Sequence, residues 1–406
     1  MKDLAAGLPG SALGGAQFKK AYGERRPNDP MIKVAVSRAE TGALALREVA
    51  AELIGRKSSF VFLLFPPRFD PGDLEAPIGE SFRHTTVFGC TTAGQITPAG
   101  YETDALVAIA FPSEHFRFSS KLFKPLAPVS IEQTAVEAER MAAQFRPNTG
   151  WNRLAITVAD GLSKQEDVFV AALHAGLREV PVFGGSAADG QSFKSTFVLH
   201  GGRFHTNAAL LLLLETDLEF RGFGFDHFET TERKLVVTGA IPEERLVVEI
   251  NGTPAAKEYA RLLGLTVEEL SPIVFAENPV LVRNGNVYHV RGIQQIHESG
   301  GLTLLSAIDE GLLLKLGRGK EIVATLYAGL DVRGEQGQKP DFILGFDCFL
   351  RKLEIVHKGL DREVSEAMRS HNVIGFNTYG EQHLGVHVNQ TFVGVAFFRP
   401  RSVSPF

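Results

Sequence analysis

Three glycine-containing segments carry small hydroxyl and acidic side chains that could bind a small ligand. Each segment follows an apolar run that has the length of a strand. Glycine and small polar residues at a strand end expose backbone N–H groups, which suit a carboxylate, a phosphate or a carbonyl. The candidate ligand-binding residues are Cys90, Thr91, Thr92, Gly184, Gly185, Ser186, Thr378, Tyr379 and Glu381. The segments lack P-loop and G-x-G-x-x-G spacing, so the alternative is that glycine only permits tight turns there.

The two cysteines give little support to an enzyme. Cys90 follows Gly89 at the end of a strand-like run, where a nucleophile could lie, but the G-x-S-x-G pattern is absent. Cys348 lies inside another apolar run, and a lone cysteine of this kind usually acts as a small apolar side chain. Two cysteines on different halves of the chain form no disulfide framework, which suits a reducing cytosol. We therefore expect no catalytic activity. The alternative is an enzyme with Cys90 as its nucleophile.

Three of the twelve histidines, His205, His227 and His387, have apolar or aromatic neighbours. An apolar pocket with one histidine could hold haem, whose iron takes a proximal imidazole. Arg203 and Arg221 flank the phenylalanine-rich segment around the first two histidines and could pair with the haem propionates, because arginine binds a carboxylate bidentately. The alternative is a phenylalanine-rich core with structural histidines and exposed arginines. No zinc-type spacing of histidine and cysteine is present.

The composition excludes several classes of protein. The chain has 406 residues, 44% of them hydrophobic and 22% charged, as in folded globular proteins. A formal net charge of -5 without a basic cluster argues against nucleic-acid binding. The longest aliphatic run, residues 208–214, is far below the roughly 18 residues that a membrane span needs. We expect a cytoplasmic protein without membrane association.

The elements around the three glycine segments form a repeat. Apolar runs begin at Phe60, Leu154 and Phe342, and in each case the glycine segment follows about 30 residues later, as a strand–helix–strand crossover requires. A further apolar run closes each repeat, at residues 105–111, 208–214 and 391–398. The pattern predicts a parallel strand pair in each repeat and a single crevice lined by the three glycine segments. Shared ancestry and mere recurrence of crossover geometry remain open alternatives.

Residues 234–327 have a different pattern, in which consecutive strands are joined by glycine-rich turns, and this predicts antiparallel pairing. The sequence therefore predicts an α/β fold, with layered mixed sheets and strand-helix-strand repeats, followed by a second α+β domain. We expect a flexible leader over residues 1–30, an N-terminal domain over residues 31–237 and a C-terminal domain over residues 238–406.

Five segments together resemble the FIST family, with its N- and C-terminal FIST domains. They are GCTTAG (89–94), GGSAAD (184–189), EINGTPAA (249–256), GFNTYGE (375–381) and NQT (389–391). The likeness covers nearly everything after residue 30, in the expected order. Within the family, the chain is most similar to the standalone nitric-oxide-sensing type, NosP, through GRFH (202–205), DCFLR (347–351) and GEQHLGVHVNQT (380–391).

The resemblance implies a sensory protein that binds haem b, senses nitric oxide and regulates a partner histidine kinase or cyclic-di-GMP enzyme. It does not identify the axial histidine. FIST domains in general are thought to sense small ligands such as amino acids. A haem-free sensor of amino acids or another small anion, bound by the glycine segments, is therefore the alternative.

Overall fold

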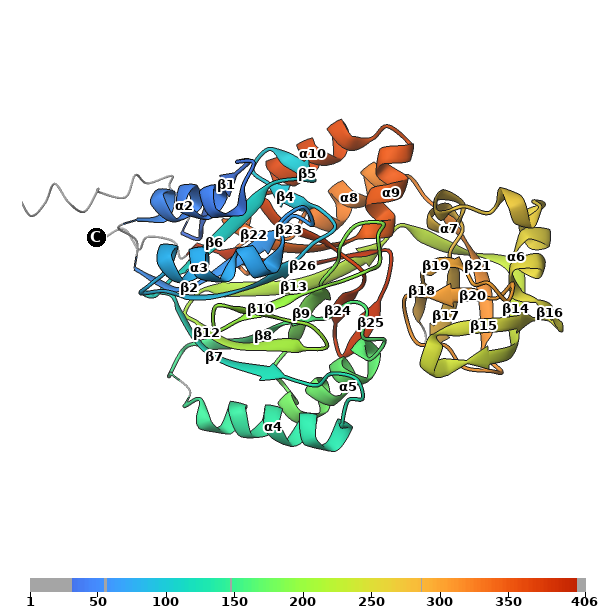
Figure 1. Cartoon of the computed structure of the whole chain (residues 1–406), viewed down its shortest axis with the longest axis horizontal. Helices are drawn as coiled ribbons and strands as arrows, with labels where there is room; N and C mark the ends of the chain where they lie inside the picture. The colour runs from blue at the N-terminus through green and yellow to red at the C-terminus, as the bar shows by residue number, and fades with distance from the viewer. Residues whose placement is uncertain (1–30, 55–56, 147, 286, 400–406) are drawn as a thin grey trace, which may run out of the picture.

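The computed structural model describes residues 31–54, 57–146, 148–285 and 287–399, so the leader expected over residues 1–30 lies outside the described residues. Figure 1 shows a larger α/β body and, beside it, a smaller unit rich in strands. The chain leaves the body after β13 (Glu219–Asp226) and returns after β21 (Leu313–Gly319). The α/β fold class predicted from the sequence is confirmed.

The body consists of three units with the same order of elements. The first unit contains β1 (Lys33–Ser37), α2 (Gly42–Leu53), β2 (Ser58–Phe65), η1 (Pro71–Asp73), α3 (Glu75–Ser81), β3 (Thr86–Thr91), β4 (Gln95–Thr97), β5 (Gly100–Glu102) and β6 (Leu106–Pro112). The second contains β7 (Phe116–Phe123), α4 (Ile131–Gln144), β8 (Asn152–Ala159), α5 (Glu166–Leu177), β9 (Val182–Ser186), β10 (Val198–His200), β11 (Arg203–His205) and β12 (Ala209–Thr216). The third contains β13, α8 (Ile322–Leu330), β22 (Phe342–Cys348), α9 (Phe349–His357), α10 (Asp361–Ser370), β23 (Val373–Thr378), β24 (Glu381–His383), β25 (Val386–Val388) and β26 (Thr391–Phe398).

Each unit has the predicted parallel strand pair. β2 pairs with β3, β8 with β9, and β22 with β23, all in parallel. The last strand of each unit, β6, β12 or β26, runs antiparallel to the first strand of that pair. The prediction of parallel pairs is therefore confirmed, and the repeat is longer than the sequence indicated, because each unit also has a leading strand.

The three units exchange their hairpins in a cycle. The hairpin β4–β5 of the first unit pairs with β23 of the third, β24–β25 of the third pairs with β9 of the second, and β10–β11 of the second pairs with β3 of the first. The result is three six-stranded sheets, each completed by a neighbour. No unit can therefore complete its own sheet alone.

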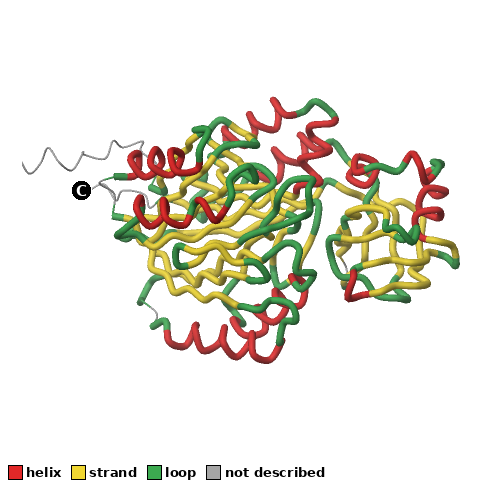
Figure 2. The backbone as a smooth tube through the Cα atoms, in the orientation of Figure 1, coloured by secondary structure: helices red, strands yellow, loops and turns green. Residues whose placement is uncertain are grey.

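The sheets enclose a shared core and carry helices on their outer faces, as Figure 2 shows for the red helices around the yellow strands. Phe62, Ile156 and Phe346, one from each unit, belong to the inner core. Helices α2 and α3 cover the first sheet, α4 and α5 the second, and α8, α9 and α10 the third. Because both faces of the central strands are buried, their sequences are continuous apolar runs.

One glycine in each unit permits close approach of backbones. The sequence predicted turns at Gly89, Gly184 and Gly375, but these residues lie inside β3, β9 and β23, and the turns follow the strand ends. A Cβ atom there would lie 1.9, 2.0 and 1.8 Å from the carbonyl oxygens of Leu63, Thr157 and Gly345, the facing residues of the parallel partners. The repeated glycine therefore serves strand packing rather than a turn.

The smaller unit, residues 228–319, is antiparallel, as the sequence predicted, and we call it the β domain. Its elements are β14 (Phe228–Ile241), η2 (Pro242–Glu244), β15 (Leu246–Ile250), β16 (Thr253–Pro254), α6 (Ala255–Leu263), η3 (Val267–Glu269), α7 (Pro272–Glu277), β17 (Val280–Asn284), β18 (Val287–Arg291), β19 (Ile293–Ile296), β20 (Leu302–Leu304) and β21. It is inserted into the third unit, between the leading strand β13 and helix α8. Residues 320–399 then complete the body.

The packing of the repeated glycines gives a first prediction. Gly375→Ala should destabilise the protein by about 3 kcal/mol, because the added methyl group would meet the backbone of β22 rather than a flexible side chain. Gly79→Ala is the matched control, since Gly79 lies in α3, where an added methyl group would have nothing within 4 Å, and helix propensity favours alanine by about 1 kcal/mol. Urea denaturation measures both effects. An unchanged midpoint for Gly375→Ala would contradict the proposed packing.

Candidate functional site

The three exchanged connections meet at the centre of the body and form a closed ring of backbone hydrogen bonds. Just beyond each strand end one N–H donates to the next unit: Ala93 N to Asn377 O at 3.0 Å, Tyr379 N to Ser186 O at 3.4 Å, and Ala188 N to Thr91 O at 3.0 Å. A second bond accompanies each step: Asn377 N to Gly94 O at 2.8 Å, Ser186 N to Gly380 O at 2.8 Å, and Thr91 N to Phe197 O at 3.1 Å. We call residues 91–93, 186–188 and 377–379 the central ring.

The candidate ligand-binding residues lie in or beside the central ring, so the structure brings the three glycine segments together. All nine candidates are buried, namely Cys90, Thr91, Thr92, Gly184, Gly185, Ser186, Thr378, Tyr379 and Glu381. Several of their side chains bond to the protein itself. Thr92 Oγ1 donates to Phe65 O at 3.0 Å and accepts from Gln95 Nε2 at 2.7 Å. The ring is thus packed rather than open, and a ligand would reach it only at its edge.

Glu381 is an acidic side chain in contact with the ring and is fully buried. Its Oε2 accepts from the Thr391 hydroxyl at 2.6 Å and the Thr391 backbone N–H at 3.2 Å, and its Oε1 accepts from the Thr378 hydroxyl. Burial raises the pKa of Glu381 to about 8, although these hydrogen bonds act in the opposite direction. The side chain is therefore predominantly protonated at neutral pH.

The two cysteines are unsuited to nucleophilic chemistry. Both are fully buried, and burial raises the pKa of the Cys90 thiol and of the Cys348 thiol far above the ordinary value. Because the thiolate is the reactive form, neither side chain is activated for attack.

The second unit departs from the symmetry of the ring. In the first and third units a single glycine, Gly94 or Gly380, links the ring to the hairpin. The second unit has residues 189–197 at this place, and we call this segment the ring loop. The loop opens a cavity of about 430 Å³, the loop cavity, at the carboxyl ends of β2, β3 and β9. In layered α/β folds, ligands bind outside the carboxyl ends of the strands.

Side chains of both charges line the loop cavity. Arg68 and Asp70 come from the segment after β2, Thr91 from the central ring, and Asp189 and Lys194 from the ring loop. Arg68 donates to the carbonyl oxygens of residues 39, 40 and 104, which fixes its guanidinium. Lys194 is exposed. The cavity thus presents an exposed cation and two carboxylates around a space of small-molecule size.

Asp189 organises the ring loop. Its Oδ2 accepts from the backbone N–H groups of Lys194 at 2.8 Å and Ser195 at 2.9 Å, and its Oδ1 accepts from the Tyr379 hydroxyl. Burial by itself would raise the pKa of Asp189, but these hydrogen bonds outweigh it and hold the pKa below its usual value. The carboxylate is therefore ionised at neutral pH and joins the loop to the third unit.

A second polar cavity, the interdomain cavity, lies between the body and the β domain and has a volume of about 290 Å³. Lys164 and Phe193 line it from the body, and Arg245, Gln294 and Thr303 are among the residues that line it from the β domain. Domain interfaces are common places for ligand pockets.

Arg245 connects the two sides of this interface. Its Nη2 lies 2.5 Å from Glu166 Oε2 and 2.7 Å from Asp167 Oδ2, both in the first turn of α5. Its Nη1 donates to Leu305 O at 2.6 Å within the β domain. Because this guanidinium is almost completely buried, the two carboxylates are needed to compensate its charge.

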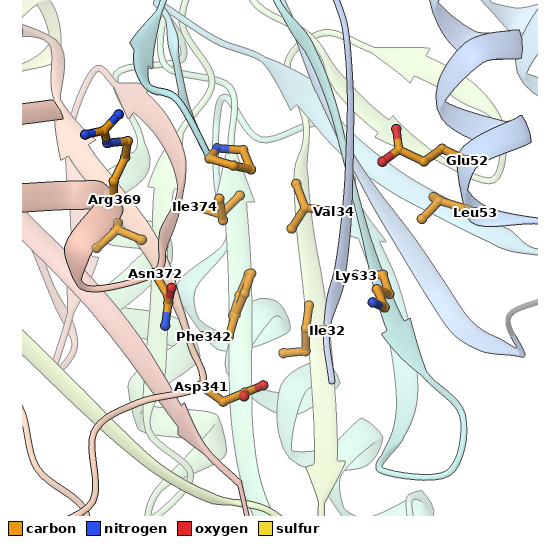
Figure 3. Close-up of a pocket in the computed structure, with 12 residues that line it drawn as sticks. Ile32, Lys33, Val34, Glu52, Leu53, Asp341, Phe342, Arg369, Asn372 and Ile374 are labelled. Atoms are coloured by element: carbon orange, nitrogen blue, oxygen red, sulfur yellow. The ribbon is translucent and has the colours of Figure 1, made fainter. Parts of the chain in front are cut away.

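A third cavity, of about 380 Å³, is mainly apolar and lies between the first and third units. Figure 3 shows Ile32, Val34, Phe342 and Ile374 at its centre, with the charged Lys33, Glu52, Asp341 and Arg369 around them. It lacks convergent polar groups from the central ring, and no histidine lines it. We therefore favour the loop cavity as the ligand site.

The three candidate histidines lie apart: two are on the edges of different sheets, and His227 lies in the connection between β13 and β14. His205 lies at the end of β11, on the edge of the first sheet, and is half-buried. His387 lies in β25, on the edge of the second sheet, and is buried. Neither of its ring nitrogens has a hydrogen-bond partner among the described residues, and burial lowers the pKa of this imidazole.

His227 serves the connection between body and β domain. Its Nε2 lies 2.8 Å from Glu354 Oε2, and its Nδ1 lies 2.9 Å from Nη1 of Arg351. Arginine only donates, so Nδ1 accepts and Nε2–H donates to Glu354. Burial lowers the pKa of His227, which keeps this neutral form. The His227 carbonyl accepts from Lys320 N at 2.7 Å, which joins the two chain crossings into the β domain.

The candidate arginines lie at the surface. Arg203 is exposed on β11, and Arg221 is 47% exposed on β13, where its Nε lies 3.6 Å from Glu219. The neighbouring phenylalanines do not form one pocket: Phe204 packs against Phe65, whereas Phe225 stacks with Phe392 on the third sheet. The structure thus separates the residues that the sequence grouped around haem.

As they lie in this structure, these residues do not together form a haem site. None of the three cavities described above is lined by His205, His227 or His387. Both ring nitrogens of His227 are engaged, and the propionate-pairing arginines face solvent on separate sheets. Of the two buried candidates, His387 is the one whose ring nitrogens are unengaged within the described part of the chain.

Sequence reasoning missed Arg68, Asp70 and Lys194. Their segments have no motif, and only the fold brings residues 67–72 beside the ring loop. One signal was present, because the second glycine segment is followed by a longer stretch before its next strand than in the other units. Arg351 and Glu354, the partners of His227, had no such signal.

The fold and the site define a three-unit α/β protein with an inserted antiparallel domain and a polar cavity at the strand ends. Comparison with protein families identifies a FIST N domain over residues 59–253 and a FIST C domain over residues 255–383. The chain therefore belongs to the FIST family, whose domains are small-ligand sensory domains of signalling proteins rather than catalytic domains. No curated protein matches the chain.

Membrane-spanning helices and metal-binding clusters are both absent from the described part of the chain. No helix in these ranges is long and apolar enough to cross a membrane. The same ranges hold no group of three or more His, Cys, Asp or Glu side chains arranged for a metal ion.

The buried carboxyl of Glu381 gives a prediction about pH. Its pKa in the folded protein, about 8, lies above the value of about 4.3 expected in the unfolded chain. Its stabilising contribution is therefore full below the unfolded pKa and is lost as pH rises through the folded pKa. Glu381→Gln, which keeps the shape but cannot ionise, should gain stability relative to the wild type as pH rises from about 5 to 8.

Thermal unfolding of both proteins between these pH values measures the effect. Glu132→Gln, on the exposed surface of α4, is the matched control. A difference in melting temperature that is constant across the range would show that Glu381 does not titrate with folding.

Proposed function

We propose that the protein senses a small zwitterionic ligand of the α-amino acid class, which binds in the loop cavity. The observation that carries this proposal is that side chains of both charges line one small polar cavity at the edge of the central ring. An amino acid needs a cation for its carboxylate and an anion for its ammonium group. Lys194 supplies the first, and Asp70 and Asp189 supply the second.

The individual contacts support a division of roles. Lys194 is exposed and lies on the ring loop, so its ammonium group can turn toward a carboxylate. Asp70 uses Oδ1 to accept from Gly72 N at 2.7 Å, and a carboxylate has two oxygens with about four acceptor sites. Asp189 is held ionised by its own loop and adds negative potential. Arg68 is fixed by backbone carbonyls and contributes positive potential rather than a flexible contact.

The chain would transmit the signal through a separate partner. FIST domains occur in signalling proteins, and a histidine kinase or a cyclic-di-GMP enzyme is the partner that the sequence resemblance implies. A cytoplasmic location, expected from composition, fits such a partner.

Isothermal titration calorimetry with individual L-amino acids tests the proposal. Lys194→Ala should weaken binding about tenfold, because it removes one charge-assisted contact to the ligand carboxylate. Lys164→Ala is the matched control, since Lys164 is an exposed lysine that lines the other polar cavity. Amino-acid methyl esters should bind the wild type about as weakly as the free amino acids bind the Lys194 variant. The absence of binding for every amino acid would contradict the proposal.

Haem-based sensing of nitric oxide is the second candidate. The resemblance to the NosP type favours it, as does the buried imidazole of His387, whose two ring nitrogens have no hydrogen-bond partner in the described ranges. Haem b would supply the iron that binds the gas, and His387 would be its axial ligand, provided that the hairpin β24–β25 moved to make room.

Visible absorbance after haem reconstitution distinguishes the two candidates. On the haem-free proposal we expect no Soret band of a histidine-ligated haem, since His205, His227 and His387 line none of the loop cavity, the interdomain cavity and the apolar cavity. A Soret band that is lost in His387→Ala but kept in His205→Ala would establish haem and reject the haem-free proposal.

A further inference from the structure

The two departures from threefold symmetry lie next to each other. The ring loop is the long connection of the second unit, and the β domain is the insertion in the third unit. Phe193 of the ring loop and Arg245 of the β domain line the same interdomain cavity. The regular units therefore carry two additional segments that meet across one space.

The ring loop separates the two polar cavities. Asp189, Ser192, Lys194 and Ser195 line the loop cavity, whereas Phe193 lines the interdomain cavity. Neighbouring residues of one short segment thus form walls of both spaces. A displacement of the loop at one cavity must therefore alter the other.

The position of Phe193 is held by specific contacts. Its ring stacks on Tyr379 with centroids 4.6 Å apart, and it packs edge-on against Phe349 at 6.4 Å. Its backbone has a φ of 48°, which is rare for a bulky residue and costs conformational energy. The contacts of Tyr379 with both Phe193 and Asp189 keep the loop in this conformation.

On the side of the β domain, the interdomain cavity is lined by residues that also attach this domain to the body. Arg245 and Leu305 line the cavity, and the same two residues take part in the link to Glu166 and Asp167 of α5. Asp167 Oδ2 also accepts from the backbone N–H of Ala307 at 3.0 Å. These contacts are the polar link between the second unit and the β domain.

We infer that the ring loop couples the loop cavity to the attachment of the β domain, with Asp189 and Phe193 as positioning residues. This inference concerns regulation and rests on the proposed function of the loop cavity. A ligand that engages Lys194 or Asp189 changes the balance between loop conformations, and Phe193 transmits that change to the wall shared with the β domain. Such coupling requires that the ligand bind the two conformations unequally.

Hydrogen exchange of the full chain without ligand tests the coupling. Asp189→Ala removes the acceptor for the loop and for Tyr379. We expect amide exchange at residues 244–247 and 303–307 to become about fivefold faster, because local opening of the interface becomes less costly. Asp70→Ala is the matched control: it also removes an aspartate that accepts a backbone N–H in the loop cavity, but it lies outside the ring loop.

A second variant guards against a general loss of structure. Phe193→Gly removes the ring that lines the interdomain cavity, keeps the Asp189 bonds and adopts a positive φ without strain. Because the ring is lost, this variant should show the same faster exchange at residues 244–247 and 303–307. Exchange in β17 and β18 should stay unchanged in every variant. Faster exchange confined to residues 189–197, or an equal effect of Asp70→Ala, would overturn the inference. Failure of amino acids to bind would reject the proposed ligand without affecting this result.

Discussion

The cyclic exchange of hairpins around the central ring is the constraint on which the rest of the structure depends. Each six-stranded sheet contains a hairpin from a neighbouring unit, and each exchanged hairpin pairs with the strand that carries the repeated glycine. That glycine lies between the hairpin strand and the parallel partner, where a side chain would meet backbone. The exchange, the shared core and the buried ring consequently form together, because none of the units closes without the others.

The symmetry of the body makes its exceptions informative. Three units enclose one core with two or three helices on each sheet, and this arrangement accounts for most of the apolar burial. The ring loop and the β domain add nothing to that symmetry, yet they border the two polar cavities. Packing alone requires neither segment, and so both are the natural places for recognition and response in a FIST sensory protein.

Electrostatics separates the structural polar groups from the groups proposed for recognition. Deep in the body, His227, Arg351 and Glu354 satisfy one another where the chain passes into the β domain, and Tyr101 donates to Asp347, which also accepts from Arg351 at 2.8 Å. Such buried charges are compensated within the protein. In the loop cavity, by contrast, Lys194 is exposed and Asp189 is ionised at the edge of the ring. A ligand would therefore meet an exposed ammonium group near a carboxylate that neutral donors hold ionised.

The sequence by itself determined the α/β class, the three parallel strand pairs and the antiparallel pairing within residues 234–327, because apolar runs and crossover spacing are local properties of the chain. It also identified Gly89, Gly184 and Gly375 as equivalent, though with a turn as the reason. Only the tertiary structure decided that hairpins are exchanged, that the antiparallel domain is an insertion, and that the glycines permit backbone contact. It also placed His205 and His387 on different sheets and His227 between β13 and β14. Those features depend on pairing between residues that lie far apart in the sequence, such as Ile96 and Gly375, and no local pattern records which strand edge a hairpin will join.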